Sequence, residues 1–312
     1  MALLTDRTLA TGVTLQDLIH IVIPTDISQN PAGSSYKATI QQIGDALSGS
    51  SYWTSGSTGN YSVKTINDSG LDAIGEYSVA SGYLTTASGD YSYAEGVETI
   101  ASAPISHAEG YQTIASGTAS HAEGVLTIAS GQTAHSEGYN TIAGGVAAHS
   151  EGGYNLASGD FSHAEGHETK ASGYSSHTEG DNTSASGDYS HAEGRYTYAN
   201  GMTSHAEGSG TTANGAATHS GGFNTSALGD YSFIHSNNSI VTGDRSVVLG
   251  GQGITGTTSD TVYVPDFVIK KTASVPTSSA DAVGENGSIT WDNTYFYWKA
   301  NGQWLRVSGS TF

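Results

Sequence analysis

The sequence contains no cysteine, only 12% charged residues and 36% hydrophobic residues. Without cysteine, neither a disulfide framework nor a thiolate metal site can form. Average globular domains contain about 45–50% apolar and about 25% charged residues, so a thick core of large aliphatic side chains is excluded. The chain, which has 42 glycines, must fold by tight backbone pairing over small side chains or remain partly disordered.

Basic residues are also scarce, with 10 Lys and Arg against 29 Asp and Glu and a net charge of -19. Direct binding to nucleic acid is therefore not expected, because it requires a basic surface. The first residues show no basic segment followed by an apolar run, so no secretory signal peptide is predicted. No run approaches the length of about 18 apolar residues that would predict a transmembrane helix or membrane insertion.

A 14-residue period dominates the middle of the sequence. One turn reads S-H-A-E-G-x-x-T-x-A-S-G-x-x, and steps of 14 from His107 meet histidine in nine consecutive turns. Two glycine columns, which include Gly110 and Gly117, keep the same register. Weaker turns extend the array back to Gly75 and forward to Ser246–Gly250, where the period stops. A fixed period of this kind indicates a repeat solenoid.

Each turn divides into two halves, each of five residues ending in glycine and followed by two variable residues. Within each five, small residues alternate with a period of two, which predicts a strand. The closing glycine predicts a corner with positive φ. A helix is not expected, because two glycines in every turn would each cost about 1 kcal/mol. Successive turns should therefore stack as parallel strands about 4.8 Å apart over an interior of Ser, Thr and Ala.

The outward columns of the two halves differ. In the T-x-A-S-G half, the variable column changes from Ile100 through Lys170 to Tyr198, as is typical of a solvent-facing column. In the S-H-A-E-G half, His and Glu recur almost unchanged, which indicates the same environment at every turn. We interpret this face as an inter-chain packing ladder with charge-assisted hydrogen bonds. A duplication history without a role for this face is the alternative. The predicted ladder consists of His107, His121, His135, His149, His163, His177, His191, His205, His219, Glu109, Glu123, Glu137, Glu151, Glu165, Glu179, Glu193 and Glu207.

Metal binding and catalysis are the other roles to consider for these residues. His-x-Glu places two possible ligands on one side of a strand. However, the pair recurs in every turn, whereas a metal site needs one distinct constellation, so neither a metal nor a cofactor is predicted. Equivalent sites without a pocket also make acid–base catalysis improbable, and no catalytic residue or enzymatic activity is predicted. Aspartates that follow glycine, such as Asp90 and Asp160, do not have calcium-loop spacing and are predicted to be corner residues.

The two repeat halves and the SVVLG at Ser246–Gly250 resemble the head repeats of YadA-like trimeric adhesins over about residues 71–250. The resemblance implies an all-β repeat solenoid, a left-handed parallel β-roll with 14-residue turns that are intertwined or packed as a homotrimer. The signal peptide, coiled-coil stalk and membrane anchor of that family are not visible. Three other stretches instead resemble bacteriophage tail-fibre proteins, namely residues 14–47, 254–269 and 289–307.

The flanks carry weaker local signals. The apolar stretch Leu15–Ile23 predicts a strand, and Ser35 predicts the cap of a short helix over residues 36–47. Val262–Ile269 predicts a strand interrupted by Pro265. Asn301-Gly302 predicts the turn of a hairpin within a small aromatic β-meander.

The aromatic side chains of this C-terminal tip are possible receptor contacts, since exposed Trp and Tyr favour recognition. They could equally form the core of the tip or its trimer contact. The candidates are Trp291, Tyr295, Tyr297, Trp298 and Trp304.

The sequence thus predicts five segments: a virion-attachment segment (1–50), a Ser/Gly-rich lead-in (51–70), the β-roll (71–256), a strand and linker (257–287) and the tip (288–312). We predict a non-enzymatic fibre of a phage virion, on the tail, baseplate or capsid, attached by its N-terminus and exposed at the surface. Its expected partners are two further copies, other virion proteins and a host-surface glycan or protein. A bacterial trimeric surface adhesin is the alternative.

Overall fold

The computed structural model describes residues 18–23, 34–39, 53–56, 59–65, 72–265, 276, 278–280, 288–291 and 295–308. The chain divides into two units, Met1–Val262 and Tyr263–Phe312. Within the described ranges every regular element is a β-strand, and none is a helix that could cross a membrane.

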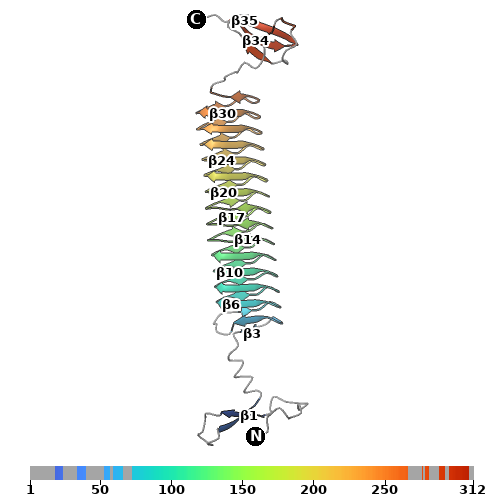
Figure 1. The fold of residues 1–312 in the computed structure, drawn as a ribbon, viewed down its shortest axis with the longest axis vertical. Coiled ribbons are helices and arrows are strands. Elements are labelled where there is room, and N and C mark those ends of the chain that lie inside the picture. The colour runs from blue at the N-terminus through green and yellow to red at the C-terminus, as the bar shows by residue number, and fades with distance from the viewer. Residues whose placement is uncertain are drawn as a thin grey trace. The chain divides into compact units, whose positions relative to one another are not determined.

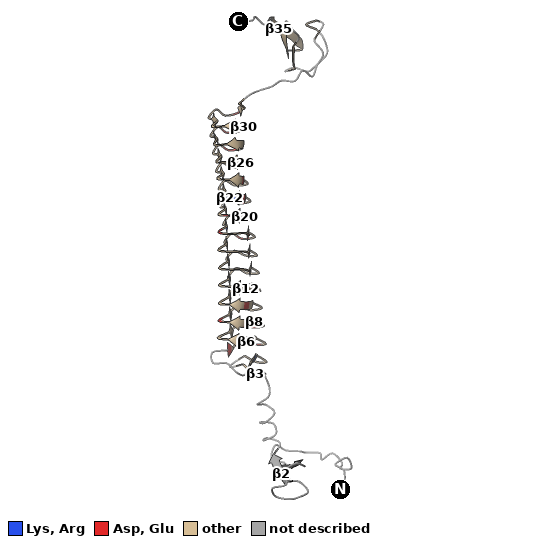
Figure 2. Ribbon diagram, turned by 60° about the vertical axis from the view of Figure 1, so that its left-hand side comes forward, with Lys and Arg blue, Asp and Glu red and all other residues tan. Residues whose placement is uncertain are grey.

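The first unit contains a solenoid of two sheets, whose strands are parallel except that Trp53–Ser55 pairs with Val63–Thr65 in an antiparallel arrangement. Figure 2 shows from another side the stack of turns seen in Figure 1. We call the two sheets the histidine sheet and the variable sheet. The histidine sheet contains β3 (Trp53–Ser55), β4 (Val63–Thr65), β6 (Val79–Tyr83), β8 (Tyr93–Val97), β10 (His107–Tyr111), β12 (His121–Val125), β14 (His135–Ser136), β16 (His149–Ser150), β18 (His163–Ala164), β20 (His177–Asp181), β22 (His191–Arg195), β24 (His205–Ser209), β26 (His219–Phe223), β28 (Phe233–Asn237), β30 (Val247–Gln252) and β32 (Val262–Tyr263). The variable sheet contains β5 (Asp72–Ala73), β7 (Thr86–Ala87), β9 (Ile100–Ala101), β11 (Ile114–Ala115), β13 (Ile128–Ala129), β15 (Ile142–Ala143), β17 (Leu156–Ala157), β19 (Lys170–Ala171), β21 (Ser184–Ala185), β23 (Tyr198–Ala199), β25 (Thr212–Ala213), β27 (Ser226–Ala227), β29 (Ile240–Val241) and β31 (Thr255–Gly256).

Strands of consecutive turns pair in parallel, residue for residue, at the predicted spacing. His107 pairs with His121 in the histidine sheet, and Ile114 pairs with Ile128 in the variable sheet. The parallel β-solenoid with 14-residue turns is therefore confirmed. The parallel pairing of strands continues beyond Gly250, although the 14-residue spacing ends there. One inserted residue shifts the register, so that Ile240 pairs with Thr255. The 14-residue spacing thus stops at Gly250 as predicted, but the pairing of strands from one turn to the next does not stop there.

Small side chains fill the space between the two sheets. In a typical turn Ala108, Thr113 and Ala115 are completely buried. The buried Ser106 hydroxyl donates a hydrogen bond to the carbonyl of Ala103, three residues earlier. Near the C-terminal end of the roll the fully buried residues are larger and include Ile234 and Val248. Because the core is thin, the backbone ladder and the contacts between neighbouring turns must hold most of the roll together.

The two glycine columns share one physical cause and differ in a second. A Cβ on Gly110 would lie 2.1 Å from the carbonyl oxygen of Gly124 in the next turn. Gly110 has the predicted positive φ of 112°, but Gly117 does not, and the left-handed residue of its corner is instead Ala119, with φ 55°. Gly117 is required by the shared cause: a Cβ there would lie 1.9 Å from the carbonyl oxygen of Gly131 in the next turn. The prediction of positive φ is therefore wrong for the second column, where close stacking of backbones excludes a side chain.

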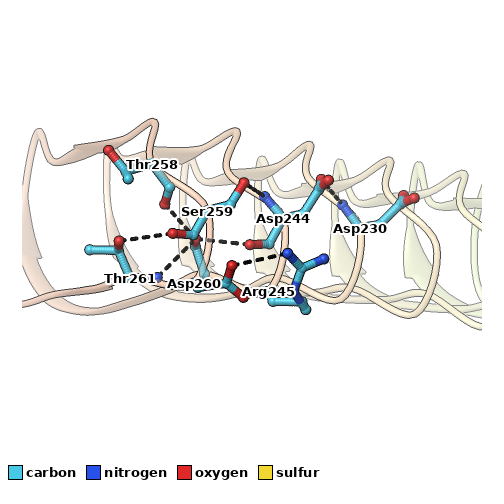
Figure 3. Close-up of polar contacts among 8 residues, drawn as sticks. Asp230, Asp244, Arg245, Thr258, Ser259, Asp260 and Thr261 are labelled. Carbon is cyan, nitrogen blue, oxygen red and sulfur yellow. Dashed lines mark hydrogen bonds and ion pairs between the residues drawn. The ribbon is translucent and has the colours of Figure 1, made fainter.

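Aspartates at the corners link successive turns. Asp160 Oδ1 accepts a hydrogen bond from the backbone N–H of Val146, and Asp244 Oδ1 accepts one from the backbone N–H of Asp230. Figure 3 shows the second contact within a row of polar side chains, beside an ion pair between Arg245 and Asp260. The predicted corner position of these aspartates is confirmed, and each spans one 14-residue step.

The flanking elements agree only in part with the sequence. Strand β1 (Leu18–Ile23) lies within the predicted strand and pairs with β2 (Ser34–Thr39) in an antiparallel arrangement. The predicted helix is wrong over residues 36–39, because their backbone groups pair with the apolar β1, and residues 40–47 lie outside the described ranges. Of the strand predicted over Val262–Ile269, β32 covers the first two residues, and residues 266–269 are likewise outside those ranges.

The second unit contains a three-stranded antiparallel meander of β33 (Ile289–Trp291), β34 (Tyr295–Ala300) and β35 (Gln303–Ser308). Asn301 and Gly302 connect the last two strands with φ values of 49° and 75°. Positive φ at both central residues is typical of a two-residue hairpin turn that matches strand twist. The predicted hairpin is therefore confirmed.

Candidate functional site

The predicted ladder forms a continuous column on the outward face of the histidine sheet. Strand alternation turns Ala108 inward and His107 and Glu109 outward, and the later turns repeat this arrangement. From His107 to His205 the imidazole rings stack with centroids 4.6 to 4.9 Å apart and planes within 7° of one another. This spacing equals that of paired strands, so ring stacking follows directly from the register.

Histidine and glutamate meet between neighbouring turns. At seven of the nine ladder histidines Nε2 faces Oε1 of the glutamate in the preceding turn, as in His121 and Glu109 at 3.3 Å and His205 and Glu193 at 3.1 Å. In both pairs the side chains remain about one-third exposed, at 33 to 35%. The structure thus brings the predicted partners together within one chain and leaves one edge of the ladder open to solvent.

Burial lowers the pKa of several ladder histidines below 6.5, and neighbouring histidines lower it further. His107, His149 and His191 are examples. These rings are therefore neutral at neutral pH, and their Nε2 atoms are buried without a hydrogen-bond partner. Among the glutamates, a hydrogen bond between Glu123 and Glu137 lowers the pKa of Glu123 and raises that of Glu137.

The ends of the imidazole column carry other aromatic rings. Tyr93 stacks on His107 with centroids 4.9 Å apart, and Phe233 stacks on His219 at 4.6 Å. The Tyr93 hydroxyl donates a hydrogen bond to Glu95, which raises the pKa of Tyr93 to about 12. A ring without a titratable nitrogen can therefore occupy this column.

The variable sheet presents a second candidate surface, which the sequence reasoning did not identify. Its outward column is apolar over five consecutive turns, from Ile100 to Leu156. An open groove of about 390 Å³ lies over the first turns and is lined by Ile100, Ile114, Leu126 and Ile128, with polar side chains at its rim. The sequence contains this run of isoleucines, but the column as a whole varies in residue type, and this variation predicts a solvent-facing position and not a binding surface.

In the tip, the predicted aromatic residues divide between core and surface. Tyr297 and Trp304 are buried, at 6 and 4% exposure, and Trp291, Tyr295 and Trp298 are half-buried. A pocket of about 290 Å³ beside them is lined by Pro276, Ser278, Ser279, Tyr297, Trp304 and Arg306. Their burial fits a core role for Tyr297 and Trp304, and a receptor contact by any of the five remains a prediction.

The family model of the YadA head domain repeat matches residues 73–101 and 122–148. The chain carries YadA head domain repeats. Both matched stretches lie within the parallel roll, and the second contains the ladder residues His135 and Glu137. A search of curated proteins finds no match to the chain. These repeats, together with the β-solenoid, are typical of structural adhesins rather than enzymes.

Proposed function

We propose that this chain forms a homotrimeric, non-enzymatic fibre in which the rolls pack through the His/Glu ladder. We further propose that the fibre belongs to a phage virion, is attached through residues 1–50 and contributes to adhesion at the host surface. The observation that carries the trimer is the ladder itself, which presents the same two side chains at the same spacing from turn to turn.

A partner that meets every turn in the same way must repeat with the spacing of the ladder. Another copy of the roll has that spacing, because its turns stack through the same backbone pairing. The open edges of His and Glu side chains could then exchange hydrogen bonds across the interface, as they do between turns of one chain. The YadA-like repeats support three copies, since the adhesins of that family are trimeric.

The virion assignment depends on the resemblance of the flanks to tail-fibre segments, whereas the YadA head repeats favour a bacterial surface adhesin as a second candidate. Both place the roll outside a cell and give it a role in attachment. They differ in the particle that carries the fibre and in the partner of residues 1–50.

The number of copies can be tested by native mass spectrometry of the purified full chain. We expect a species of three times 32.0 kDa that persists at submicromolar concentration. A folded species of 32.0 kDa at the same concentration would contradict the trimer.

The absence of enzymatic activity can be tested by incubating the protein with host-surface glycans and then measuring the length of the glycan chains. Any shortened glycan would refute the proposal that the fibre is non-enzymatic.

The location can be tested with antibodies raised against the roll. Immunogold electron microscopy should label fibres on phage particles released from the producing cells. Labelling confined to the bacterial surface would overturn the virion assignment and favour the adhesin, without affecting the result for the trimer.

A further inference from the structure

The ladder changes at its C-terminal end. One turn after Glu207, the glutamate position holds Gly221, and in the following turn it holds His235. The histidine position passes from His219 to Phe233 across the same step. Three consecutive turns therefore each supply one potential metal ligand: Glu207 on β24, His219 on β26 and His235 on β28. They surround Gly221, which has no side chain at the position that glutamate occupies in the preceding turns.

The three side chains converge over Gly221. Oε1 of Glu207 lies 3.2 Å from Nε2 of His219 and 3.5 Å from Nδ1 of His235. The point that a Cβ of Gly221 would occupy is nearly equidistant from all three donor atoms, at 2.7 Å from His235 Nδ1, 2.9 Å from Glu207 Oε1 and 3.0 Å from His219 Nε2. Because glycine has no side chain, no Cβ separates the three donor atoms, and an ion could lie between them at a point farther from the Cα of Gly221 than a bonded Cβ would be.

His219 differs from the other histidines of the ladder. Its ring stands at 87° to the ring of His205, although the preceding rings are nearly parallel. Like Nε2 of His107, His135, His149, His177 and His191, its Nε2 is buried without a hydrogen-bond partner, so the rotated ring is what distinguishes it.

The regular turns are less suited to hold an ion. Donor atoms of His107, Glu109 and His121 also lie within 4.8 Å of one another. However, the two imidazole planes are 7° apart and their centroids 4.6 Å apart, so the ring nitrogens lie side by side and cannot point at one centre. One ring would have to rotate out of the stack before both could bind the same metal.

We propose that Glu207, His219 and His235 bind one divalent transition-metal ion of the Zn²⁺ type in the space above Gly221. Zinc binds imidazole nitrogen at about 2.0–2.1 Å and carboxylate oxygen at about 2.0–2.2 Å, so two ligands of a tetrahedral site lie roughly 3.3 Å apart. Glu207 Oε1 lies at similar distances, 3.2 and 3.5 Å, from His219 Nε2 and His235 Nδ1. Two histidines and one carboxylate leave a fourth position for water or for a group from a partner. The distinct constellation that the repeat lacks arises where Gly221 interrupts it. The bound ion would link three consecutive turns.

The test uses the full chain after treatment with a chelator and removal of the chelator. Titration with Co²⁺, which has visible absorption bands in tetrahedral sites, should show saturable binding of one ion per chain, and Zn²⁺ should displace it. His235→Ala removes an exposed ligand and should weaken binding by more than about 100-fold, since even second-shell changes cost 10- to 100-fold. Gly221→Ala keeps all ligands but places a methyl group between them, and should also abolish saturable binding.

His149→Ala, which removes a ring from the regular ladder, is the matched control and should leave the affinity and the one-ion stoichiometry unchanged. Circular dichroism of each variant establishes that the roll is folded. The proposal fails if the unaltered chain binds no Co²⁺, or if His235→Ala and Gly221→Ala bind it as tightly as the unaltered chain. It also fails if His149→Ala lowers the affinity as much as His235→Ala, which would indicate association along the whole ladder.

Discussion

The two sheets of the roll share one backbone repeat but differ in their outward side chains. The histidine sheet presents nearly the same His and Glu from His107 to Glu207, whereas the outward column of the variable sheet passes from Ile114 through Lys170 to Thr212. Over these turns the inward columns of both sheets hold Ala, Ser and Thr, except at Asn155. The 14-residue spacing therefore does not require a constant outward face, because the variable sheet maintains the spacing without one.

This difference separates two causes of repetition. Close backbone stacking and the thin core explain the constant glycines and the constant inward residues of both sheets. The constant outward face of the histidine sheet needs a further cause, and we attribute it to packing against other copies. The predictions below test the first cause, then the second, and then the consequences of the ladder and of the corners.

The largest effect is expected from a methyl group in the closely stacked glycine column. In Gly145→Ala the new Cβ would lie 2.0 Å from the carbonyl oxygen of Gly159, and rigid backbone cannot move away cheaply. We expect a loss of about 3 kcal/mol or more in unfolding free energy, which lowers Tm by at least about 6 °C. Thermal unfolding followed by circular dichroism measures it.

The neighbouring Gly144 is the matched control. A Cβ at Gly144 has no atom closer than 3.8 Å, so Gly144→Ala should be neutral or stabilise the roll by about 0.4–1 kcal/mol. If the alanines at 144 and 145 had equal effects on Tm, glycine would be retained in this column for some reason other than stacking distance.

The second prediction compares the outward faces. The double variant Glu137→Lys with Glu151→Lys reverses charge on the histidine sheet, and neighbouring lysines repel one another within a chain about as much as neighbouring glutamates do. We expect folded monomers of 32.0 kDa in place of trimers. The corresponding variant of the variable sheet, Ile114→Lys with Ile128→Lys, should remain trimeric. The opposite outcome by native mass spectrometry would assign the interface to the isoleucine groove.

The third prediction concerns pH. Burial lowers the folded-state pKa of His135 and His149 below 6.5, so between the two values the unfolded chain binds more protons than the folded chain. Stability from this source is complete above about pH 6.5, falls as pH drops from about 6.5 to the lowered pKa, and does not change further below it. The pKa shifts of the glutamates affect stability nearer pH 4.5. Their effects on stability oppose one another, since the pKa of Glu137 is raised and that of Glu151 is lowered.

We therefore expect Tm to decrease from pH 7.5 to pH 5.5. His149→Phe should make this decrease smaller, because phenylalanine keeps the stacked ring, as Phe233 does at the end of the column, but cannot bind a proton. Calorimetry at the two pH values measures the difference. An equal decrease in the variant and the unaltered chain would show that His149 does not contribute to the acid sensitivity.

The regular part of the fold could be predicted from the sequence because every turn repeats the same local signal. Alternation with a period of two placed Ala108 inside and His107 outside, and equal spacing set His107 beside His121. Each turn meets a copy of itself, so local pattern and non-local pairing agree. The outward position of His107 and Glu109 was predictable for the same reason, whereas their packing against another chain stays a prediction.

The remaining features depend on contacts that no local pattern encodes. The backbone distance that requires Gly117 is a property of two stacked turns, and the pairing of β2 with β1 overrode a helical pattern. The donor set over Gly221 combines Glu207, His219 and His235, which come from three consecutive turns at a point where the repeat departs from its consensus. Such a site is found by examining the irregular turn in three dimensions, not by extending the regular one.

The smallest effect is expected at the corners, which lie between the two sheets. Asp244→Ala removes the acceptor of the backbone N–H of Asp230, at 3.0 Å, in an exposed position where water can replace it. A hydrogen bond of this kind contributes about 0.5–1.5 kcal/mol, and exposure favours the lower end. Asp244→Asn retains Oδ1 as an acceptor and should be nearly neutral in chemical denaturation. If asparagine were as destabilising as alanine, the carboxylate charge rather than the hydrogen bond would link these turns, and raised salt should then weaken the unaltered roll.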